Sequence, residues 1–260
     1  MKDQENTPVN YATVNGLKMY YEIHGTGNPL VLLHGGGSTL QSTYGHILPE
    51  LAKYHKVIAV ELQAHGHTAD RGRPLSFEQD ADDVAELLKQ LHIEKADIMG
   101  FSNGGTTTLQ IAIRHPEIVN KLILASANYK LDGMQPDFFD GFKHATLENM
   151  PKPLQDAYLD ANPDPKGLQI MFDRDVERMS AFKDISDDDI KAIQAHTLII
   201  NGDAEVVRVE HALELSHTLP HAKLAIIPGG HGDYIGEICS PNIQSKIPDL
   251  VAAMIEEFLK

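Results

Sequence analysis

The chain of 260 residues contains a single cysteine, Cys239, and no apolar run of the length that a membrane-spanning helix needs. One cysteine cannot form an internal disulfide, and it has no partner thiols for a zinc or iron–sulfur site, so we interpret Cys239 as a buried or idle thiol. The opening residues, MKDQENTPVN, show neither the basic start nor the apolar segment of a secretory signal. We therefore expect a cytoplasmic protein.

Positive charge is also scarce. The chain carries 22 Lys and Arg residues against 37 Asp and Glu residues, a formal net charge of -15. A surface with this charge repels phosphate backbones and anionic lipids, so we expect neither nucleic acid nor a membrane among the partners of the protein.

Metal and cofactor signatures are missing too. The 14 histidines include no H-E-x-x-H pattern, and the close pair His65 and His67 has no nearby carboxylate at ligand spacing. No G-K-[ST] is present, and HGTGNP (residues 24–29) lacks the third glycine of a dinucleotide fingerprint. We expect no metal and no cofactor, and a small molecule as the partner; these residues do not indicate an oligomeric state.

The chain does have enough apolar residues, 42% of the total, to bury one large core. Short aliphatic runs alternate with amphipathic helical patterns, which is typical of parallel strands joined by crossover helices. An Asn15-Gly16 turn predicts an antiparallel strand pair before them. The sequence therefore predicts an α/β fold with a mostly parallel central sheet flanked by helices. The buried strands are predicted at Leu30–Leu33, Val57–Val60, Ala96–Phe101, Lys121–Ser126, Thr197–Ile200 and Lys223–Ile227.

Two amphipathic stretches predict helices that pack on this sheet. Ser76 and Gln79 have the spacing of a capping box, and the apolar residues after them repeat on one helical face. The C-terminal stretch predicts a second such helix, with an apolar stripe made of Ile247, Leu250, Val251, Met254, Ile255 and Phe258.

One region interrupts the alternation. Residues 128–193 contain no convincing strand, several prolines and scattered Phe and Met residues. We interpret them as an inserted helical cap, with residues 1–127 and 194–260 forming the core. The cap would lie at the carboxyl ends of the strands, where ligands bind in open α/β sheets. Its apolar residues either line a pocket or pack the cap itself, and they are Met134, Phe138, Phe139, Phe142, Met171, Phe172 and Met179.

The sequence GFSNG places Ser102 between Gly100 and Gly104, after an apolar run and before a helical stretch that ends at Pro116. A strand that turns sharply into a helix holds the residue at the corner in strained geometry, and side chains two positions away on either side would collide. Glycine removes that collision. The G-x-S-x-G pattern therefore predicts a corner that exposes the Ser102 hydroxyl at the top of the sheet.

With this corner in place, the chain resembles the α/β-hydrolase superfamily, in particular its small cap-bearing members such as carboxylesterases, perhydrolases and cofactor-independent carbon–carbon bond hydrolases. Four further stretches are similar to family motifs, and the likeness extends over nearly all of the chain outside residues 128–193. LVLLHGGG (30–37) resembles the strand and oxyanion loop, VELQAHGHT (60–68) the D-x-x-G-x-G stretch, IINGDAEVV (199–207) the acid turn and PGGHGDY (228–234) the histidine loop.

The resemblance implies a triad in the order nucleophile, acid, base. Ser102 is then the nucleophile, and His231 is the base that removes its proton. The acid turn offers two carboxylates, Asp203 and Glu205. The family acid commonly lies three residues after the turn glycine, here Gly202, which favours Glu205 although aspartate is usual in that role. If the turn does not let the longer side chain reach the imidazole, Asp203 is the alternative.

Attack on a carbonyl builds negative charge on oxygen, which fixed donors must stabilise. By resemblance these donors are the backbone N–H of Asn103, the residue after the nucleophile, and an amide of the glycine loop, for which we expect Gly36. We expect His34 to be structural in that loop.

These residues predict a serine hydrolase that acts on small, mostly apolar carboxylic esters through an acyl-enzyme. The same site could open lactones, carry out perhydrolysis or cleave a carbon–carbon bond next to a ketone, because all of these use the serine corner and the oxyanion hole. A hydrolase-like binding protein without activity is the alternative from another class. No charged residue can be assigned to the pocket from sequence, so a strongly anionic substrate is not supported.

Overall fold

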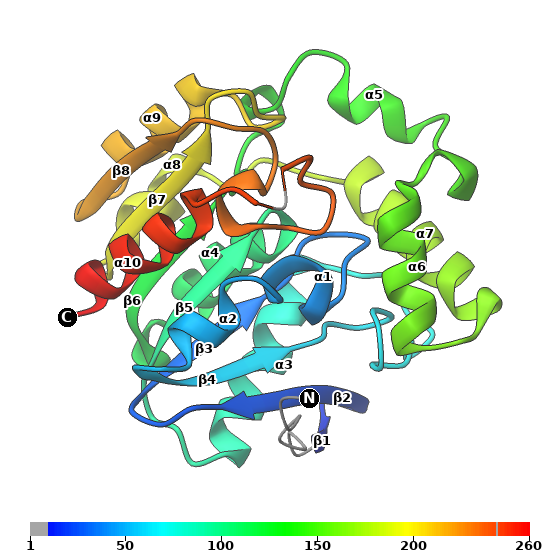
Figure 1. The fold of residues 1–260 in the computed structure, drawn as a ribbon, viewed down its shortest axis with the longest axis horizontal. Coiled ribbons are helices and arrows are strands. Elements are labelled where there is room, and N and C mark those ends of the chain that lie inside the picture. The colour runs from blue at the N-terminus through cyan, green and yellow to red at the C-terminus, as the bar shows by residue number, and fades with distance from the viewer. Residues whose placement is uncertain (1–9, 243) are drawn as a thin grey trace.

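The computed structural model, shown in Figure 1, describes residues 10–242 and 244–260. Its strands are β1 (Asn10–Val14), β2 (Leu17–His24), β3 (Asn28–Leu33), β4 (His55–Val60), β5 (Ala96–Phe101), β6 (Val119–Ala125), β7 (His196–Gly202) and β8 (Ala222–Ile227). Its α-helices are α1 (Leu40–Tyr44), α2 (Leu48–Leu51), α3 (Phe77–Gln90), α4 (Asn103–Arg114), α5 (Phe138–Phe142), α6 (Lys152–Ala161), α7 (Pro165–Ser180), α8 (Asp187–Ala192), α9 (Val209–Thr218) and α10 (Ile247–Leu259). Short 3-10 helices form at η1 (Pro116–Ile118), η2 (Leu131–Gly133), η3 (Leu147–Asn149) and η4 (Asp233–Ile235).

The strands form one eight-stranded sheet in the order β1-β2-β4-β3-β5-β6-β7-β8. The pairs β1–β2 and β2–β4 are antiparallel, and every other pair is parallel. All six predicted strands are present, with ends that differ from the prediction by a few residues, and the predicted antiparallel pair turns at Asn15-Gly16. The prediction that Lys223–Ile227 is buried is wrong, because β8 lies at the edge of the sheet and none of its residues is fully buried. β3 and β5 are neighbours, so the loops that follow them lie side by side at the carboxyl edge of the sheet.

In the central strands both faces of the sheet are buried: alternate residues point to opposite sides, and helices cover each side. In β3, Val31 and Leu33 join the apolar cluster under α3, α4, α8 and α9. Leu30 and Leu32 join the cluster on the other face, under α1, α2, η4 and α10. This two-sided burial explains why the strands read as continuous aliphatic runs.

The predicted helix starts and stripes are largely present. Ser76 caps α3 by accepting a hydrogen bond from the Gln79 amide, but the capping box is only half formed, because the Gln79 side chain donates to Asp83 instead. In α10 the predicted stripe is wrong at Leu250, which is 69% exposed. Of the two interpretations of Cys239, a buried or an idle thiol, burial is wrong, because Cys239 is a free and exposed cysteine.

The segment 128–193 between β6 and β7, which we call the helical insertion, contains α5 to α8 and no strand among its residues, apart from an isolated bridge between Met134 and Val207. In Figure 1, α5, α6 and α7 lie beyond the ends of the strands, whereas α8 lies near β7 and contacts α4 and α9. The insertion is closed at its base, because the Ile185 amide donates to the Tyr129 carbonyl at 2.8 Å.

Within residues 10–242 and 244–260, no helix is long and apolar enough to cross a bilayer.

The α3 face of the core gives a stability prediction. Leu88 is fully buried between α3 and the sheet, so Leu88→Ala leaves a cavity and is expected to lower the free energy of unfolding by about 2–5 kcal/mol. The exposed neighbour Lys89 provides the control, since Lys89→Ala is expected to stay within about 0.5 kcal/mol of the parent. Urea unfolding followed by circular dichroism measures both; equal stability of the two variants would contradict the packing described.

Candidate active site

Ser102 forms the corner between β5 and α4, with φ 54° and ψ -120°. Its own amide donates to the Ala125 carbonyl at 2.8 Å, which ties the corner to β6. The flanking glycines are required by contact: a Cβ at Gly100 would lie 2.0 Å from the Gly104 carbonyl oxygen, and a Cβ at Gly104 would lie 2.2 Å from the Leu33 carbonyl oxygen. A side chain at either glycine would therefore collide with a backbone carbonyl, that of Gly104 in the first case and that of Leu33 in the second.

The structure brings Ser102, His231 and Glu205 into one hydrogen-bonded chain. His231 Nε2 lies 3.1 Å from Ser102 Oγ, and His231 Nδ1 lies 2.8 Å from Glu205 Oε1. Because a carboxylate faces Nδ1, that nitrogen carries the ring proton, and Nε2 is left to accept from the serine hydroxyl. The Glu205 side chain is buried, whereas Ser102 and His231 are partly open to the pocket.

The two candidate acids contact different parts of the histidine loop. Glu205 Oε1 contacts the ring of His231, and its Oε2 accepts from the Val206 amide at 3.1 Å. Asp203 Oδ1 instead accepts from the amide of Gly229 at 2.9 Å, at the start of the loop. The longer glutamate side chain therefore reaches the imidazole, and the aspartate holds the backbone that carries it.

Gly36, Asn103, Ser102 and His231 line one pocket of about 320 Å³. The Asn103 side chain packs directly on Gly36, since a Cβ at Gly36 would come within 2.4 Å of Asn103 Nδ2. The Asn103 amide opens α4, where the first N–H groups have no partner inside a helix. Within the part of the chain that the structure describes, the Gly36 amide has no hydrogen-bond partner either.

The rest of this pocket, which we call the Ser102 pocket, is mostly apolar and comes from the helical insertion. Of the seven apolar residues singled out from sequence, Met134 and Phe139 do not line it. The five that line it are Phe138, Phe142, Met171, Phe172 and Met179. Several of these residues also belong to the apolar clusters of the insertion. They therefore both line the pocket and pack the insertion, the two roles considered from sequence.

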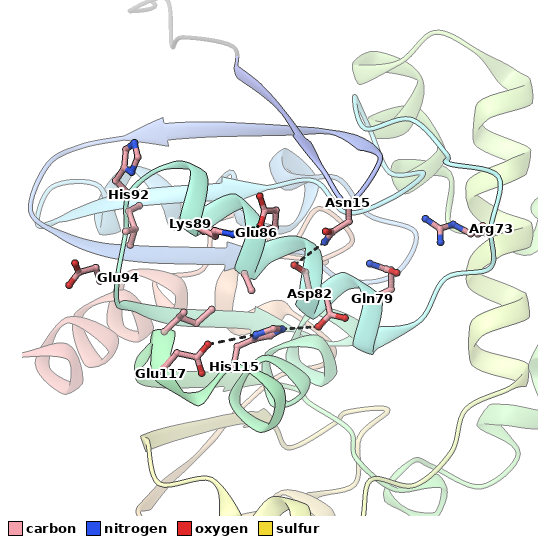
Figure 2. Close-up of a pocket in the computed structure, with 13 residues that line it drawn as sticks. Asn15, Arg73, Gln79, Asp82, Glu86, Lys89, His92, Glu94, His115 and Glu117 are labelled. Atoms are coloured by element: carbon pink, nitrogen blue, oxygen red, sulfur yellow. Dashed lines mark hydrogen bonds and ion pairs between the residues drawn. The ribbon is translucent and has the colours of Figure 1, made fainter.

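A larger hollow, of about 980 Å³, lies away from Ser102, along α3 and the loops before β5 and β6 (Figure 2). Some of its polar side chains pair with one another: Asp82 contacts His115, and His115 also faces Glu117. Asp82 is also bound by Arg114, which lies outside the lining. None of the residues of the Ser102 chain lines it. We therefore assign the candidate active site to the Ser102 pocket.

A buried chain of four charged side chains, which sequence reasoning missed, borders the Ser102 pocket. Asp80 of α3 accepts from Arg178 of α7 at 2.9 Å, and Arg178 donates to Asp175 at 2.5 Å. Asp175 lies 2.9 Å from His65 Nε2 and accepts from the Gly37 amide at 2.5 Å. No sequence motif predicts these contacts, because most of the partners are 98 to 138 residues apart in the chain. The exception is the Arg178–Asp175 pair, which lies on one turn of α7.

The charges along this buried charge chain alternate in sign. Both ring nitrogens of His65 face acceptors, the Gln63 carbonyl at 2.8 Å and the Asp175 carboxylate, which favours the imidazolium. Burial is the largest single influence and would lower the pKa of His65, but the charge of Asp175 together with the hydrogen bonds to Asp175 and to the Gln63 carbonyl raises that pKa. Burial alone would raise the pKa of Asp175, but the His65 and Arg178 charges hold it well below its usual range. Burial raises the pKa of Asp80 to about 6.

Two expectations about histidines can be compared with the structure: the role of His34 and the His65–His67 pair. His34 Nε2 accepts from the Leu62 amide at 3.0 Å, and Nδ1 contacts the Gly35 carbonyl, so it braces the glycine loop as expected. Burial and the neighbouring His65 charge lower the pKa of His34 to about 3. His65 and His67 each contact a carboxylate, but a different one: Asp175 faces His65, and Glu61 faces His67. In the described residues no group of three or more His, Cys, Asp or Glu side chains could hold a metal ion.

Comparison with known families adds a second line of information. The family model described as "alpha/beta hydrolase fold" matches residues 28–174. Human serine hydrolase BPHL is 26% identical to this chain over 264 residues, which cover 95% of this chain and 84% of the relative. The 2-hydroxy-6-oxo-2,4-heptadienoate hydrolase of Pseudomonas putida is 29% identical over 227 residues, 78% of this chain and 81% of the relative.

Solved structures share the fold at lower identity. A 2-hydroxy-6-oxo-6-phenylhexa-2,4-dienoate hydrolase from Rhodococcus superposes with a TM-score of 0.79 at 20% identity, covering 98% of this chain and 99% of that one. A thermophilic esterase from Thermogutta terrifontis superposes with a TM-score of 0.76 at 20% identity, covering 97% and 98%. Together with the eight-stranded sheet, these likenesses confirm the predicted fold.

The two carboxylates of the acid turn give the next prediction. Glu205→Gln keeps the shape of the side chain but removes the charge that fixes the His231 ring, so turnover of a p-nitrophenyl ester is expected to fall by about four orders of magnitude. Asp203→Asn keeps an acceptor oxygen for the Gly229 amide and is expected to lose far less. Steady-state kinetics of both variants decide; a severe loss in the aspartate variant alone would show that the acid was assigned wrongly.

Proposed function

The chain belongs to the α/β-hydrolase family, a family of hydrolases, and on that basis we propose that it is a serine hydrolase acting on small, mostly apolar carboxylic esters. The observation that carries the proposal is the hydrogen-bonded chain from Ser102 Oγ through the His231 ring to Glu205. A serine hydroxyl is a poor nucleophile until a base removes its proton, and this arrangement supplies both the base and the carboxylate that orients it.

In the first half of the proposed reaction, Ser102 Oγ attacks the ester carbonyl carbon while its proton passes to His231 Nε2. The buried Glu205 carboxylate stabilises the resulting imidazolium. The tetrahedral intermediate then collapses, the bond to the alcohol oxygen breaks, and His231 returns the proton to the departing alcohol. The acyl group remains on Ser102 as an ester.

The negative charge that develops on the carbonyl oxygen needs fixed donors, for which we propose the amides of Gly36 and Asn103. The contacts of the loop support Gly36 rather than its neighbour, because the Gly37 amide already donates to Asp175. The position of Asn103 at the start of α4 adds the positive end of a helix dipole.

In the second half, a water molecule loses a proton to His231 Nε2 and attacks the acyl carbon. The same two amides stabilise the second tetrahedral intermediate, and Ser102 leaves with the proton from His231. The products are a carboxylic acid and an alcohol. The helical insertion acts as the cap that covers the acyl group, in a protein that we propose to be cytoplasmic.

The lining of the Ser102 pocket supports an uncharged substrate. Among the described residues that line it, none is Lys or Arg, and the charged or titratable members are Asp175 and His231. The relative named for a heptadienoate acts, by that name, on a carboxylate-bearing compound. A carboxylate in this pocket would lose its hydration without a cation to replace it. Carbon–carbon bond hydrolysis is nevertheless the second candidate, because of these relatives; lactone opening and perhydrolysis use the same site.

Labelling with a fluorophosphonate tests the nucleophile. We expect a single adduct on Ser102, located by mass spectrometry of the digested protein, and we expect the Ser102→Ala variant to remain unlabelled. The reagent reacts only with a serine whose proton is removed by a neighbouring base. An adduct on another residue, or no adduct in the parent protein, would reject the mechanism and favour a binding protein.

A matched pair of esters tests the substrate class. p-Nitrophenyl pentanoate and mono-p-nitrophenyl glutarate differ by a terminal methyl against a terminal carboxylate. We expect kcat/KM for the glutarate ester to be at least about tenfold lower, because its charge would be buried without a partner. Turnover of the glutarate ester at an equal or higher rate would contradict the proposed preference and move carbon–carbon cleavage of a dienoate to first place.

A further inference from the structure

Asp175 reaches the reaction site from a distant part of the chain. It lies on α7 of the helical insertion, and its Oδ2 accepts from the amide of Gly37, which is 138 residues away. The carboxylate also lies against Gly36, since a Cβ at Gly36 would approach Oδ2 to 3.4 Å. The side chain thus joins the insertion to the loop that carries a proposed oxyanion donor.

That loop has little else to fix its conformation. Residues 35–37 are all glycine, and Gly37 has φ +66°, so the loop carries no side chain of its own to pack. His34 braces its beginning through the Leu62 amide. The peptide between Gly36 and Gly37 is held by two contacts: Asp175 accepts from the Gly37 amide, and Ser38 Oγ donates to the Gly36 carbonyl at 3.3 Å. The Gly36 N–H belongs to the preceding peptide, so fixing the Gly36–Gly37 peptide restricts the direction of that N–H through the two backbone torsions of Gly36.

A negative charge beside an oxyanion hole is unfavourable unless it is neutralised. Arg178 donates to Asp175 Oδ1, and His65 faces Oδ2, so two cations flank the carboxylate. Asp80 compensates the Arg178 charge at the far end. The buried charge chain is therefore balanced, and Asp175 can hold Gly37 without opposing the charge that develops on the substrate oxygen.

We propose that Asp175 is a positioning residue of the proposed hydrolase, whose carboxylate holds the Gly36–Gly37 peptide so that the Gly36 amide faces the substrate oxyanion. Asp175 does not touch the reacting atoms. Both parts of the protein then contribute to the oxyanion hole. The core supplies the glycine loop, and the helical insertion supplies the carboxylate that holds the loop in place. The inference rests on the proposed role of Ser102.

Two variants of the same helix test this role. Asp175→Asn removes the charge that binds His65 and Arg178 and weakens the hold on Gly37. Asp173→Asn, two residues away and exposed, is the matched control. We expect the rate of Ser102 labelling by a fluorophosphonate, whose phosphoryl oxygen also needs the oxyanion donors, to fall about 10- to 100-fold in Asp175→Asn and to stay unchanged in Asp173→Asn.

A pair of inhibitors separates positioning from a general loss of structure. A short-chain trifluoromethyl ketone forms a tetrahedral adduct with an oxyanion, whereas the corresponding methyl ketone binds without one. In Asp175→Asn the inhibition constant of the trifluoromethyl ketone is expected to rise by the same factor as the labelling rate falls, with the methyl ketone within about twofold. A proportional loss for both ketones, or labelling at the parental rate, would overturn the inference.

Asp175→Glu keeps the test decisive if the asparagine variant does not fold. It preserves the charge of the buried chain but moves the carboxylate by one methylene, so the labelling rate and the affinity for the trifluoromethyl ketone are expected to fall together. A folded glutamate variant with both values unchanged contradicts the proposal. Absence of labelling in the parent protein would instead refute the proposed function, which keeps the two failures distinct.

Discussion

The site depends on one backbone constraint, the positive φ of a non-glycine residue at the end of β5. Ser102 can hold φ 54° only because nothing projects from Gly100 and Gly104. Such a conformation costs on the order of 1–3 kcal/mol, which the packed core on both faces of the sheet offsets. The absence of a Cβ at Gly104 also lets α4 approach the carbonyl of Leu33. That approach places the loop after β3 beside Asn103, so one constraint both exposes the hydroxyl and brings Gly36 and Asn103 together.

Local patterns made much of this predictable. The aliphatic runs locate the central strands because strands buried on both faces admit few polar residues, and β8 was found by the same signal although it lies at the exposed edge. The glycine spacing locates the corner because the steric requirement lies within five residues. The order of serine, acid and histidine was predicted from the resemblance to the family motifs. The choice between Asp203 and Glu205 was less secure, since both follow one turn and only the backbone path shows which side chain reaches the ring.

Contacts between residues far apart in the chain could not be predicted from the sequence. In the sequence, Asp175 and Arg178 are not distinguishable from solvent-exposed charges on an amphipathic helix. They are buried because α7 packs where Asp80 and His65 lie. The reverse error occurred at Leu250, whose helical position suggested burial although it lies outside the area that the sheet covers. Hydrophobic periodicity predicts neither the burial of Asp175 and Arg178 nor the exposure of Leu250. It shows which face of a helix is apolar, but not how much of that face the rest of the protein covers.

The closure at the base of the insertion has a consequence for diversification. Because the Ile185 amide and the Tyr129 carbonyl join where the segment leaves and re-enters the core, the residues between them form a loop with fixed ends. The entropic cost of holding the two ends of such a segment together grows only slowly with its length, so residues added or removed between the ends change the stability of the sheet little. Such changes reshape the pocket above Ser102 and leave the corner unaltered, which fits a fold shared by proteins named for different reactions.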